Sequence, residues 1–235
     1  MRIFRDLPAL SAYAADLFVE SAAQAIADRG RFLVALSGGT TPIALYGLLT
    51  RRPIDWTHVH VFWGDERCVP VEDPGNNYGQ ARGTLLNQVP IPSRNIHRVK
   101  SELDPPEAAR DYAHVLKRFA APPLAWPRFD LVLLGMGEDG HVASLFPGSP
   151  PEVAEPVIAV AANYQQRPAN RVTLTPPVLN AARQVLFLVS GQSKSGTLAS
   201  VLKGDYQPLE LPAQRIQPAD GKVTWLVDAG AAGKL

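Results

Sequence analysis

Short, mostly apolar runs recur along this chain, and each ends at a glycine or a polar turn. They cover residues 31–36, 58–63, 129–134, 185–189 and 223–227. Because the runs are apolar rather than alternating, we expect strands that are buried on both faces of a sheet. Segments with helical spacing lie between them, which favours right-handed crossovers and a mostly parallel sheet. The sequence therefore predicts an α/β fold with a doubly wound sheet and helices on both faces.

The segments between these runs contain the expected helices. An alanine-rich amphipathic helix is expected over the first 28 residues, ending at Gly30. Thr41 is expected to cap a second helix, whose first residue is Pro42. The other expected elements are helices at 77–86, 105–119 and 193–203 and weaker strands at 157–160 and 171–175.

Neither a repeat nor a shift in composition divides the chain, so a single domain over residues 1–235 is expected. Two proline-rich tracts, 152–168 and 208–218, are either surface connections or a small α+β subdomain.

Composition narrows the range of partners. Lys and Arg number 23 and Asp and Glu 22, a net charge of +1 that lacks the basic excess of nucleic-acid and anionic-membrane binders. No apolar run is long enough to cross a bilayer, and charges interrupt the start of the chain where a signal peptide would be apolar. Cys68 is the single cysteine, so no internal disulfide forms. We expect a cytoplasmic protein with neither a nucleic-acid nor a membrane partner.

In an open α/β sheet, ligands bind beyond the carboxyl ends of the strands, so the loops after the apolar runs are where a site is expected. The first of these loops is Ser37-Gly38-Gly39-Thr40-Thr41-Pro42. Its small residues allow a ligand to approach closely, and the N-terminus of the next helix presents unpaired N–H groups to an anion. The loop is therefore either a phosphate-binding turn or a tight connection that binds nothing.

The loop after the run 129–134 is Gly135-Met136-Gly137-Glu138-Asp139-Gly140-His141. It matches the dinucleotide pattern G-x-G-x-x-G, but Pro147 and Gly148 end any following helix too early for that use. A histidine beside a carboxylate is instead the arrangement that general acid/base catalysis near neutral pH requires. His141 with Asp139 is thus a candidate catalytic pair, and an ordinary solvated histidine is the alternative.

Charged residues follow two other runs. Asp65 and Arg67 come after the run 58–63 and form either part of a catalytic site or a structural ion pair. The loop after 185–189 does not match the P-loop pattern, but it contains Lys194, a candidate phosphate contact together with Arg171. The alternative is that each is an ordinary exposed cation without a ligand.

Two further features are weak. His58 and His60 share a strand face, but a third metal ligand is not evident, so no metal site is expected. Cys68 has no adjacent histidine pattern that would mark a nucleophilic thiol.

Four longer motifs are much more specific than these short patterns. They are LSGGTTP, FWGDERCVPVEDPGNNYGQAR, LVLLGMGEDGHVASLFPG and RVTLTPPVLNAA, in this order. Together they resemble the family of 6-phosphogluconolactonases and glucosamine-6-phosphate isomerases, and the resemblance extends from about Phe4 to the end of the chain. It implies a modified Rossmann-like fold. In the isomerases, a glutamate stands where this chain has Phe146 and a tyrosine where it has Arg67, so the resemblance favours the lactonases.

The resemblance implies hydrolysis of 6-phospho-D-glucono-1,5-lactone to 6-phospho-D-gluconate in the oxidative pentose phosphate pathway, with no cofactor. It implies His141 as general base on water with Asp139 nearby, and Asp65 and Arg67 as further active-site residues. The residues that it implies for phosphate and substrate contact are Ser37, Gly38, Gly39, Thr40, Arg171 and Lys194. We expect a monomer or a weak homo-oligomer.

Two alternatives are kept. The first is an isomerase or deaminase that acts on glucosamine 6-phosphate. The second is a non-catalytic regulator that binds a sugar phosphate. Transcription regulators with this kind of fold carry a helix-turn-helix segment, and neither the N-terminus nor the charge balance of this chain indicates one.

Overall fold

The computed structural model describes residues 1–150, 152–164 and 168–235. Its larger sheet has six strands in the order β1-β9-β8-β5-β2-β3, and every neighbouring pair is parallel. The strands are β1 (Arg2–Phe4), β2 (Phe32–Leu36), β3 (Val59–Trp63), β5 (Leu131–Leu134), β8 (Gln184–Val189) and β9 (Lys222–Asp228). Each apolar run of the sequence forms one of these strands. The short edge strand β1 was not predicted and lies where the first helix was expected to begin; its residues are mostly exposed, so its pairing with β9 leaves no apolar run in the sequence.

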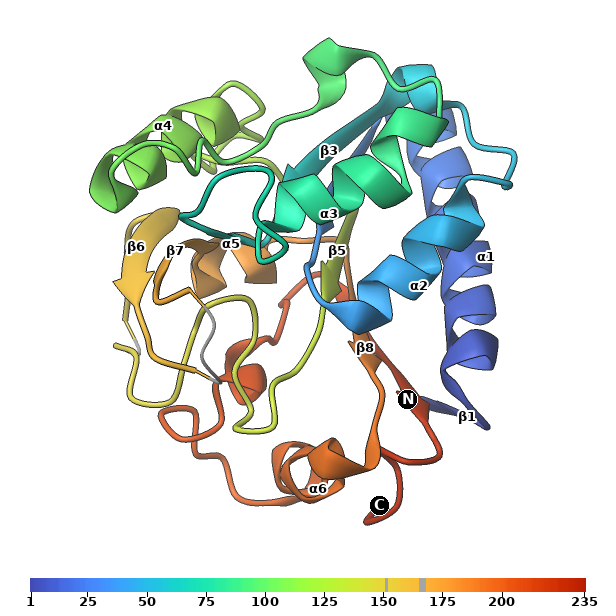
Figure 1. Ribbon diagram of the computed structural model, residues 1–235, viewed down its shortest axis with the longest axis vertical. Helices are drawn as coiled ribbons and strands as arrows, with labels where there is room; N and C mark the ends of the chain where they lie inside the picture. The colour runs from blue at the N-terminus through green and yellow to red at the C-terminus, as the bar shows by residue number, and fades with distance from the viewer. Residues whose placement is uncertain (151, 165–167) are drawn as a thin grey trace.

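Helices cover both faces of this sheet, as the doubly wound prediction requires. They are α1 (Leu7–Arg29), α2 (Thr40–Leu49), α3 (Asn77–Thr84), α4 (Pro105–Lys117), α5 (Pro176–Asn180) and α6 (Ser195–Lys203). Figure 1 shows α1, α2 and α3 on one side of the strands and α4, α5 and α6 on the other. In the described part of the chain, none of the helices combines the length and the apolar character that a bilayer crossing requires.

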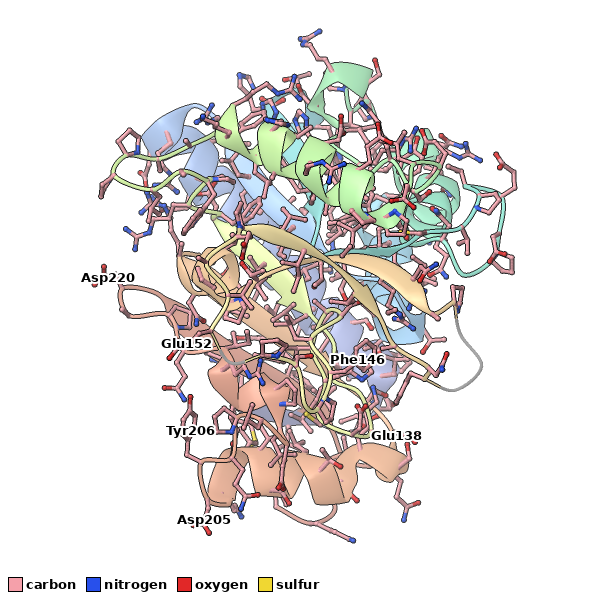
Figure 2. All side chains as sticks on the ribbon, turned by 90° about the vertical axis from the view of Figure 1, so that its left-hand side faces the viewer. Glu138, Phe146, Glu152, Asp205, Tyr206 and Asp220 are labelled. Atoms are coloured by element: carbon pink, nitrogen blue, oxygen red, sulfur yellow. The ribbon has the colours of Figure 1, made fainter. Side chains whose placement is uncertain are left out.

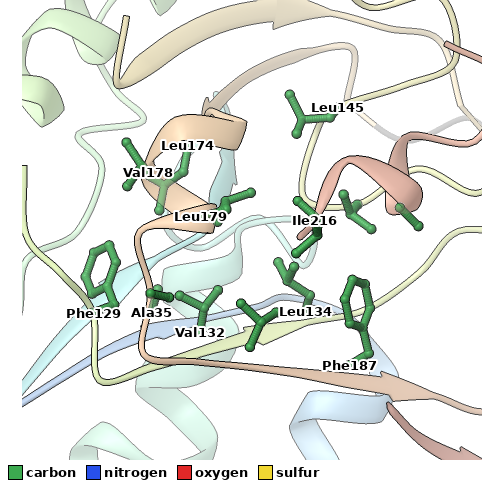
Figure 3. Close-up of a cluster of buried hydrophobic side chains, with 14 of the residues drawn as sticks. Ala35, Phe129, Val132, Leu134, Leu145, Leu174, Val178, Leu179, Phe187 and Ile216 are labelled. Atoms are coloured by element: carbon green, nitrogen blue, oxygen red, sulfur yellow. The ribbon is translucent and has the colours of Figure 1, made fainter. Parts of the chain in front are cut away.

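The apolar core forms two layers, because successive strand side chains point to opposite faces. On β2, Phe32, Val34 and Leu36 pack toward α1 and α2, whereas Leu33 and Ala35 pack on the other side. Figure 3 shows that second layer, with Ala35 and Val132 of the sheet on the side of α5 and Leu134 beneath Ile216. Burial on both faces explains why the strands are apolar at every position.

A second, smaller sheet lies on the α4 and α5 side. Its strands β4 (Asp65–Arg67), β7 (Asn170–Leu174) and β6 (Val157–Ala161) pair antiparallel in the order β4-β7-β6. One sequence interpretation was therefore wrong. Residues 65–67 form a strand, not a loop, because they pair with a distant segment. The weaker strands expected at 157–160 and 171–175 are confirmed as β6 and β7, so the proline-rich tract 152–168 contains a strand of this sheet; its residues 165–167 lie outside the described residues.

The position of the site follows from the strand order. From β2 the chain first adds β3 on one side and later adds β5 on the other. The loops after β2 and β5 therefore leave neighbouring strands at the point where the winding reverses, which is where such sheets bind ligands. The start of α2 differs from the prediction: Gly39 is the N-cap, and Thr40 is the first helical residue. Pro42 is accommodated because N–H groups of the first turn need no partner within the helix.

Candidate active site

A cavity of about 260 Å³ opens at the carboxyl ends of β2, β5 and β8. Apart from Asp139, every predicted site residue lines it: Ser37, Gly38, Gly39, Thr40, Asp65, Arg67, His141, Arg171 and Lys194. The small sheet supplies Asp65 and Arg67 from β4 and Arg171 from β7. Segments that are far apart in the sequence therefore meet at one cavity.

The turn after β2 forms one wall of this cavity. Tyr46 of α2 holds it, donating from its hydroxyl to the Ser37 carbonyl at 2.6 Å and accepting from the Ser37 N–H at 3.1 Å. Gly39 has a φ of 103°, a conformation that favours glycine, and it leads directly into α2. The first N–H groups of a helix lack partners within the helix, so this end of α2 favours an anion.

His141, which also lines the cavity, forms a close pair with Asp139. Nδ1 of His141 lies 2.6 Å from Oδ1 of Asp139, which also accepts the backbone N–H of His141 at 3.1 Å. Burial disfavours the charged form of Asp139, but its hydrogen bonds with His141 outweigh this effect and hold the pKa of Asp139 below its usual value. An ionised Asp139 that accepts from Nδ1–H leaves Nε2 of His141 as the nitrogen available to a ligand.

Aromatic rings enclose the imidazole. The ring centroid of Phe146 lies 4.5 Å from that of His141, and the Tyr164 ring meets it edge-on at 4.6 Å. The Tyr164 hydroxyl also accepts the N–H of Glu138 at 3.2 Å. Glu138 and Phe146, labelled in Figure 2, both belong to the segment that follows β5. The imidazole is therefore fixed by packing as well as by its carboxylate partner.

Asp65 is buried, with an exposed fraction of 5%, and hydrogen-bond donors hold it from two sides. Ser144 donates its hydroxyl to Oδ2 at 2.6 Å, and Asn77 donates its amide to Oδ1 at 3.3 Å. The N–H of Ser144 in turn donates to the hydroxyl of Thr173, the residue opposite Asp65 in the small sheet. Asp65 thus reaches the cavity as an oriented hydrogen-bond acceptor.

Arg67 and Arg171 lie directly opposite each other on β4 and β7. Both are buried, and both line the cavity. Arg67 donates to the Gly75 carbonyl at 2.6 Å, and the Arg171 guanidinium lies over the Phe146 ring at 5.1 Å. Two neighbouring buried cations repel each other, so this arrangement favours an anion in the cavity.

Lys194 extends this positive character from the loop after β8. The loop is held by Asp228, the last residue of β9, which accepts from the Ser190 hydroxyl and from the Gly191 N–H. Burial raises the pKa of Asp228, but these donors and the charge of Lys194 outweigh it, so that the pKa lies below its usual value. Asp228 therefore anchors the loop that carries the cation.

Glu66, between Asp65 and Arg67 on β4, does not line the cavity and has a structural role. It is fully buried and accepts the N–H groups of Arg67, Asn77 and Tyr78 at 2.7 to 2.8 Å. Burial raises the pKa of Glu66 to about 7, although these hydrogen bonds favour ionisation. Its carboxylate therefore holds the start of α3 against β4.

Sequence reasoning missed Asn77, Ser144, Tyr164 and Asp228 as contributors to the site. Asp228 could have been found, because it directly follows a predicted strand. The other three contact the site through tertiary packing and carry no pattern of their own.

His60 does not join a metal cluster. Its Nδ1 lies 3.1 Å from Nε2 of His97, away from the cavity. The described residues contain no group of three or more histidine, cysteine or acidic side chains that could hold a metal ion.

Comparison with known proteins gives consistent results. The family model described as glucosamine-6-phosphate isomerases/6-phosphogluconolactonase matches residues 5–225. A 6-phosphogluconolactonase of Synechocystis sp. is 42% identical over 214 residues, covering 90% of this chain and 88% of that protein. The crystal structure of 6-phosphogluconolactonase from Thermotoga maritima superposes with a TM-score of 0.86 and 29% identity, covering 97% and 98% of the two chains. A monomeric glucosamine-6-phosphate deaminase shares the fold, with a TM-score of 0.85, 20% identity and complete coverage of both chains.

Proposed function

Because the chain belongs to the glucosamine-6-phosphate isomerase/6-phosphogluconolactonase family, we propose that it hydrolyses 6-phospho-D-glucono-1,5-lactone to 6-phospho-D-gluconate. One observation carries this proposal: an anion-binding turn and a histidine paired with a carboxylate line the same small cavity. The turn at 38–40 and His141 are then the two ends of a site for one phosphorylated sugar. The substrate needs both, because its phosphate on C6 and its ester carbonyl at C1 are separate groups that must be held at the same time.

The phosphate binds at the N-terminus of α2 in this proposal. Gly38, Gly39 and Thr40 present backbone groups there, and Arg171 and Lys194 supply positive charge. Hydrogen bonds to charged groups contribute about 1.5 to 3 kcal/mol each, so several contacts select a phosphorylated ligand over a neutral sugar. The same binding energy orients the carbonyl toward His141.

His141 acts as the general base. With Nδ1 held by Asp139, Nε2 takes a proton from water as the water oxygen attacks the lactone carbonyl carbon. The resulting imidazolium then protonates the ring oxygen as the carbon–oxygen bond of the ester breaks. The product is an open-chain acid that loses a proton to solvent. Each turnover consumes one water molecule and returns His141 to its neutral form.

Arg67 and Asp65 complete the site. The Arg67 guanidinium or loop N–H groups stabilise the negative charge that develops on the carbonyl oxygen. Asp65, already held by Ser144 and Asn77, accepts a hydrogen bond from a hydroxyl of the sugar.

The isomerase and deaminase alternative is less well supported. In this chain the ring of Phe146 packs on His141, at the place where the resemblance puts a catalytic glutamate in the isomerases. The similarity to a deaminase at 20% identity shows the fold alone, whereas the relative at 42% identity is a lactonase. Release of ammonia from glucosamine 6-phosphate would restore this alternative, and phosphate-ligand binding without any turnover would favour the regulator.

The direct test generates the lactone enzymatically in the cuvette and follows the appearance of 6-phosphogluconate with and without the protein. We expect a rate well above spontaneous hydrolysis and proportional to protein concentration. A rate equal to the spontaneous one would contradict the proposed function.

Two substitutions separate the proposed roles. His141→Ala is expected to lower kcat by a factor of about 10² to 10⁴, the usual contribution of a positioned base, with little change in phosphate affinity. Lys194→Ala is expected to raise KM strongly instead, because it removes a phosphate contact. Steady-state kinetics on both variants shows whether each residue acts in the chemical step or in phosphate binding. A native kcat in His141→Ala would mean that His141 is not the general base.

A further inference from the structure

Asn77 lies between the turn after β2 and the strand β4 that carries Asp65. It is the first residue of α3, and its backbone N–H donates to Oε1 of the buried Glu66 at 2.7 Å. Its side chain is also buried, with an exposed fraction of 2%. A helix start of this kind needs only the backbone contact, so the buried side chain requires a separate explanation.

One end of that side chain contacts β4. Nδ2 of Asn77 donates to the carbonyl oxygen of Asp65 at 2.9 Å and to its carboxylate Oδ1 at 3.3 Å. Both partners are acceptors, so the nitrogen of the amide must face them and the amide orientation is fixed. The carboxylate of Asp65 therefore takes its direction partly from Asn77.

The other end contacts the turn after β2. A Cβ atom placed on Gly38 would lie only 1.8 Å from Oδ1 of Asn77, so the Gly38 backbone packs directly against the amide oxygen. The φ of Gly38 is not in the left-handed region, so Asn77, and not backbone strain, excludes a side chain here. Oδ1 has no hydrogen-bond partner among the residues that the structure describes, which leaves Gly38 as its neighbour.

We propose that Asn77 is a positioning residue that links the anion-binding turn at Gly38 to the Asp65 carboxylate and so sets the spacing between these two parts of the site. The proposal rests on the proposed function, because it assigns to the turn the phosphate and to Asp65 a sugar hydroxyl of one substrate. A rigid amide between two backbone segments keeps that spacing constant when the cavity is empty. A shift of about 1 Å in such a spacing costs on the order of 100-fold in rate.

A purely structural role for Asn77 would be to start α3, and a double-substitution experiment separates the two roles. It compares the wild type, Gly38→Ala, Asn77→Ala and the double variant by kcat and KM on the lactone. We expect Gly38→Ala to lower kcat/KM about 100-fold in the wild type, because the new methyl group displaces the turn. In the Asn77→Ala background, which frees that space, the same change should cost less than about threefold.

Asn77→Ala alone is expected to lower kcat about 10-fold or more, because Asp65 loses a donor. Asn77→Asp keeps the volume but replaces the donor with an acceptor, so Gly38→Ala should remain as harmful in that background as in the wild type. If Asn77→Ala does not fold, Asn77→Ser, which also frees the space beside Gly38, takes its place in the comparison. Equal effects of Gly38→Ala in all backgrounds, or native kcat in Asn77→Ala, would overturn the proposal.

The neighbouring Asn76 is the matched control. Its side chain caps α3 by accepting the Gly79 N–H at 2.7 Å, and its amide donates to Val69 and Ser101 rather than to Asp65. Asn76→Ala should therefore lower the Tm while kcat and KM stay native.

Titration with inorganic phosphate measures the affinity of the turn at Gly38 directly, so it tests the role of Asn77 without any turnover of the lactone. Gly38→Ala should weaken phosphate binding in the wild type and have little effect in Asn77→Ala. If the wild type does not hydrolyse the lactone, the proposed function fails, yet this coupling in phosphate affinity still tests the link. Absence of coupling in a wild type that does hydrolyse the lactone would overturn the link alone.

Discussion

Gly137 shows how strongly a single residue constrains the catalytic pair. A Cβ atom at this position would lie 2.1 Å from Nδ1 of His141 and 2.5 Å from Oδ1 of Asp139. Its φ is not in the left-handed region, so any L-residue could adopt its backbone conformation. The glycine is therefore required by the space that the hydrogen bond occupies, and not by the turn.

Gly137→Ala is expected to lower kcat about 100-fold while the Tm changes by only a few degrees, because the methyl group separates His141 from Asp139. Gly47→Ala in α2 is the matched control, since no atom lies within 4 Å of its added methyl group and it does not line the cavity. Kinetics and thermal unfolding of both variants provide the measurement. Equal losses of kcat in the two variants would contradict this explanation.

Individual site residues were predictable where they follow a strand directly. His141 and Lys194 belong to loops after β5 and β8, so the rule about strand ends was sufficient to find them. Ser144 and Asn77 were not predictable, because each reaches Asp65 across segments that only the folded chain brings together. No spacing in the sequence encodes such a contact.

The start of α3 depends on a carboxylate from another element. Glu66 of β4 accepts the N–H groups of Asn77 and Tyr78, both in the first turn of α3. A negative charge at this end of a helix is favourable, and here it is also buried. The orientation of α3, and with it Asn77, thus depends on Glu66.

Glu66→Ala is expected to lower the free energy of unfolding by about 3 kcal/mol or more, because it leaves buried N–H groups without an acceptor. Glu66→Gln keeps one acceptor oxygen and should lose clearly less. Urea unfolding of both variants measures the difference. A loss in Glu66→Ala no larger than that in Glu66→Gln would show that these hydrogen bonds contribute little.

The strands and helices of the larger sheet were predictable because burial on both faces makes their sequences continuously apolar. The small sheet was only partly predictable. β4 has three residues, and all of them are charged. Such a segment forms a strand only because β7 pairs with it, and pairing between distant segments leaves no local signal.

Across the whole molecule, stability at acid pH depends on groups far from the cavity. His97 and His60 form a hydrogen bond with each other and pack on Phe62 and Phe119. Burial lowers the pKa of His97 to about 4, and the charges of His60 and Arg118 act in the same direction. Burial and the nearby charges of Arg31, Arg94 and His58 likewise lower the pKa of His60.

A depressed histidine pKa means that the unfolded chain binds protons more readily than the folded one. Between the ordinary histidine pKa of 6.5 and about 4, the contribution of His97 to stability is therefore lost as the pH falls. Glu66 works in the opposite direction, since its raised pKa makes the folded state bind a proton more readily up to about pH 7. The observed dependence is the sum of these opposing contributions, so it must be assigned by substitution.

We expect His97→Gln to reduce the fall in Tm between pH 7.5 and pH 5, because the variant no longer takes up a proton on unfolding. Each variant is compared with itself at the two pH values, so the packing lost on removing the imidazole largely cancels. His114→Gln, which changes an exposed histidine of α4, is the matched control and should retain the fall seen in the wild type. A fall in His97→Gln as large as that in His114→Gln would show that acid sensitivity arises elsewhere in the molecule.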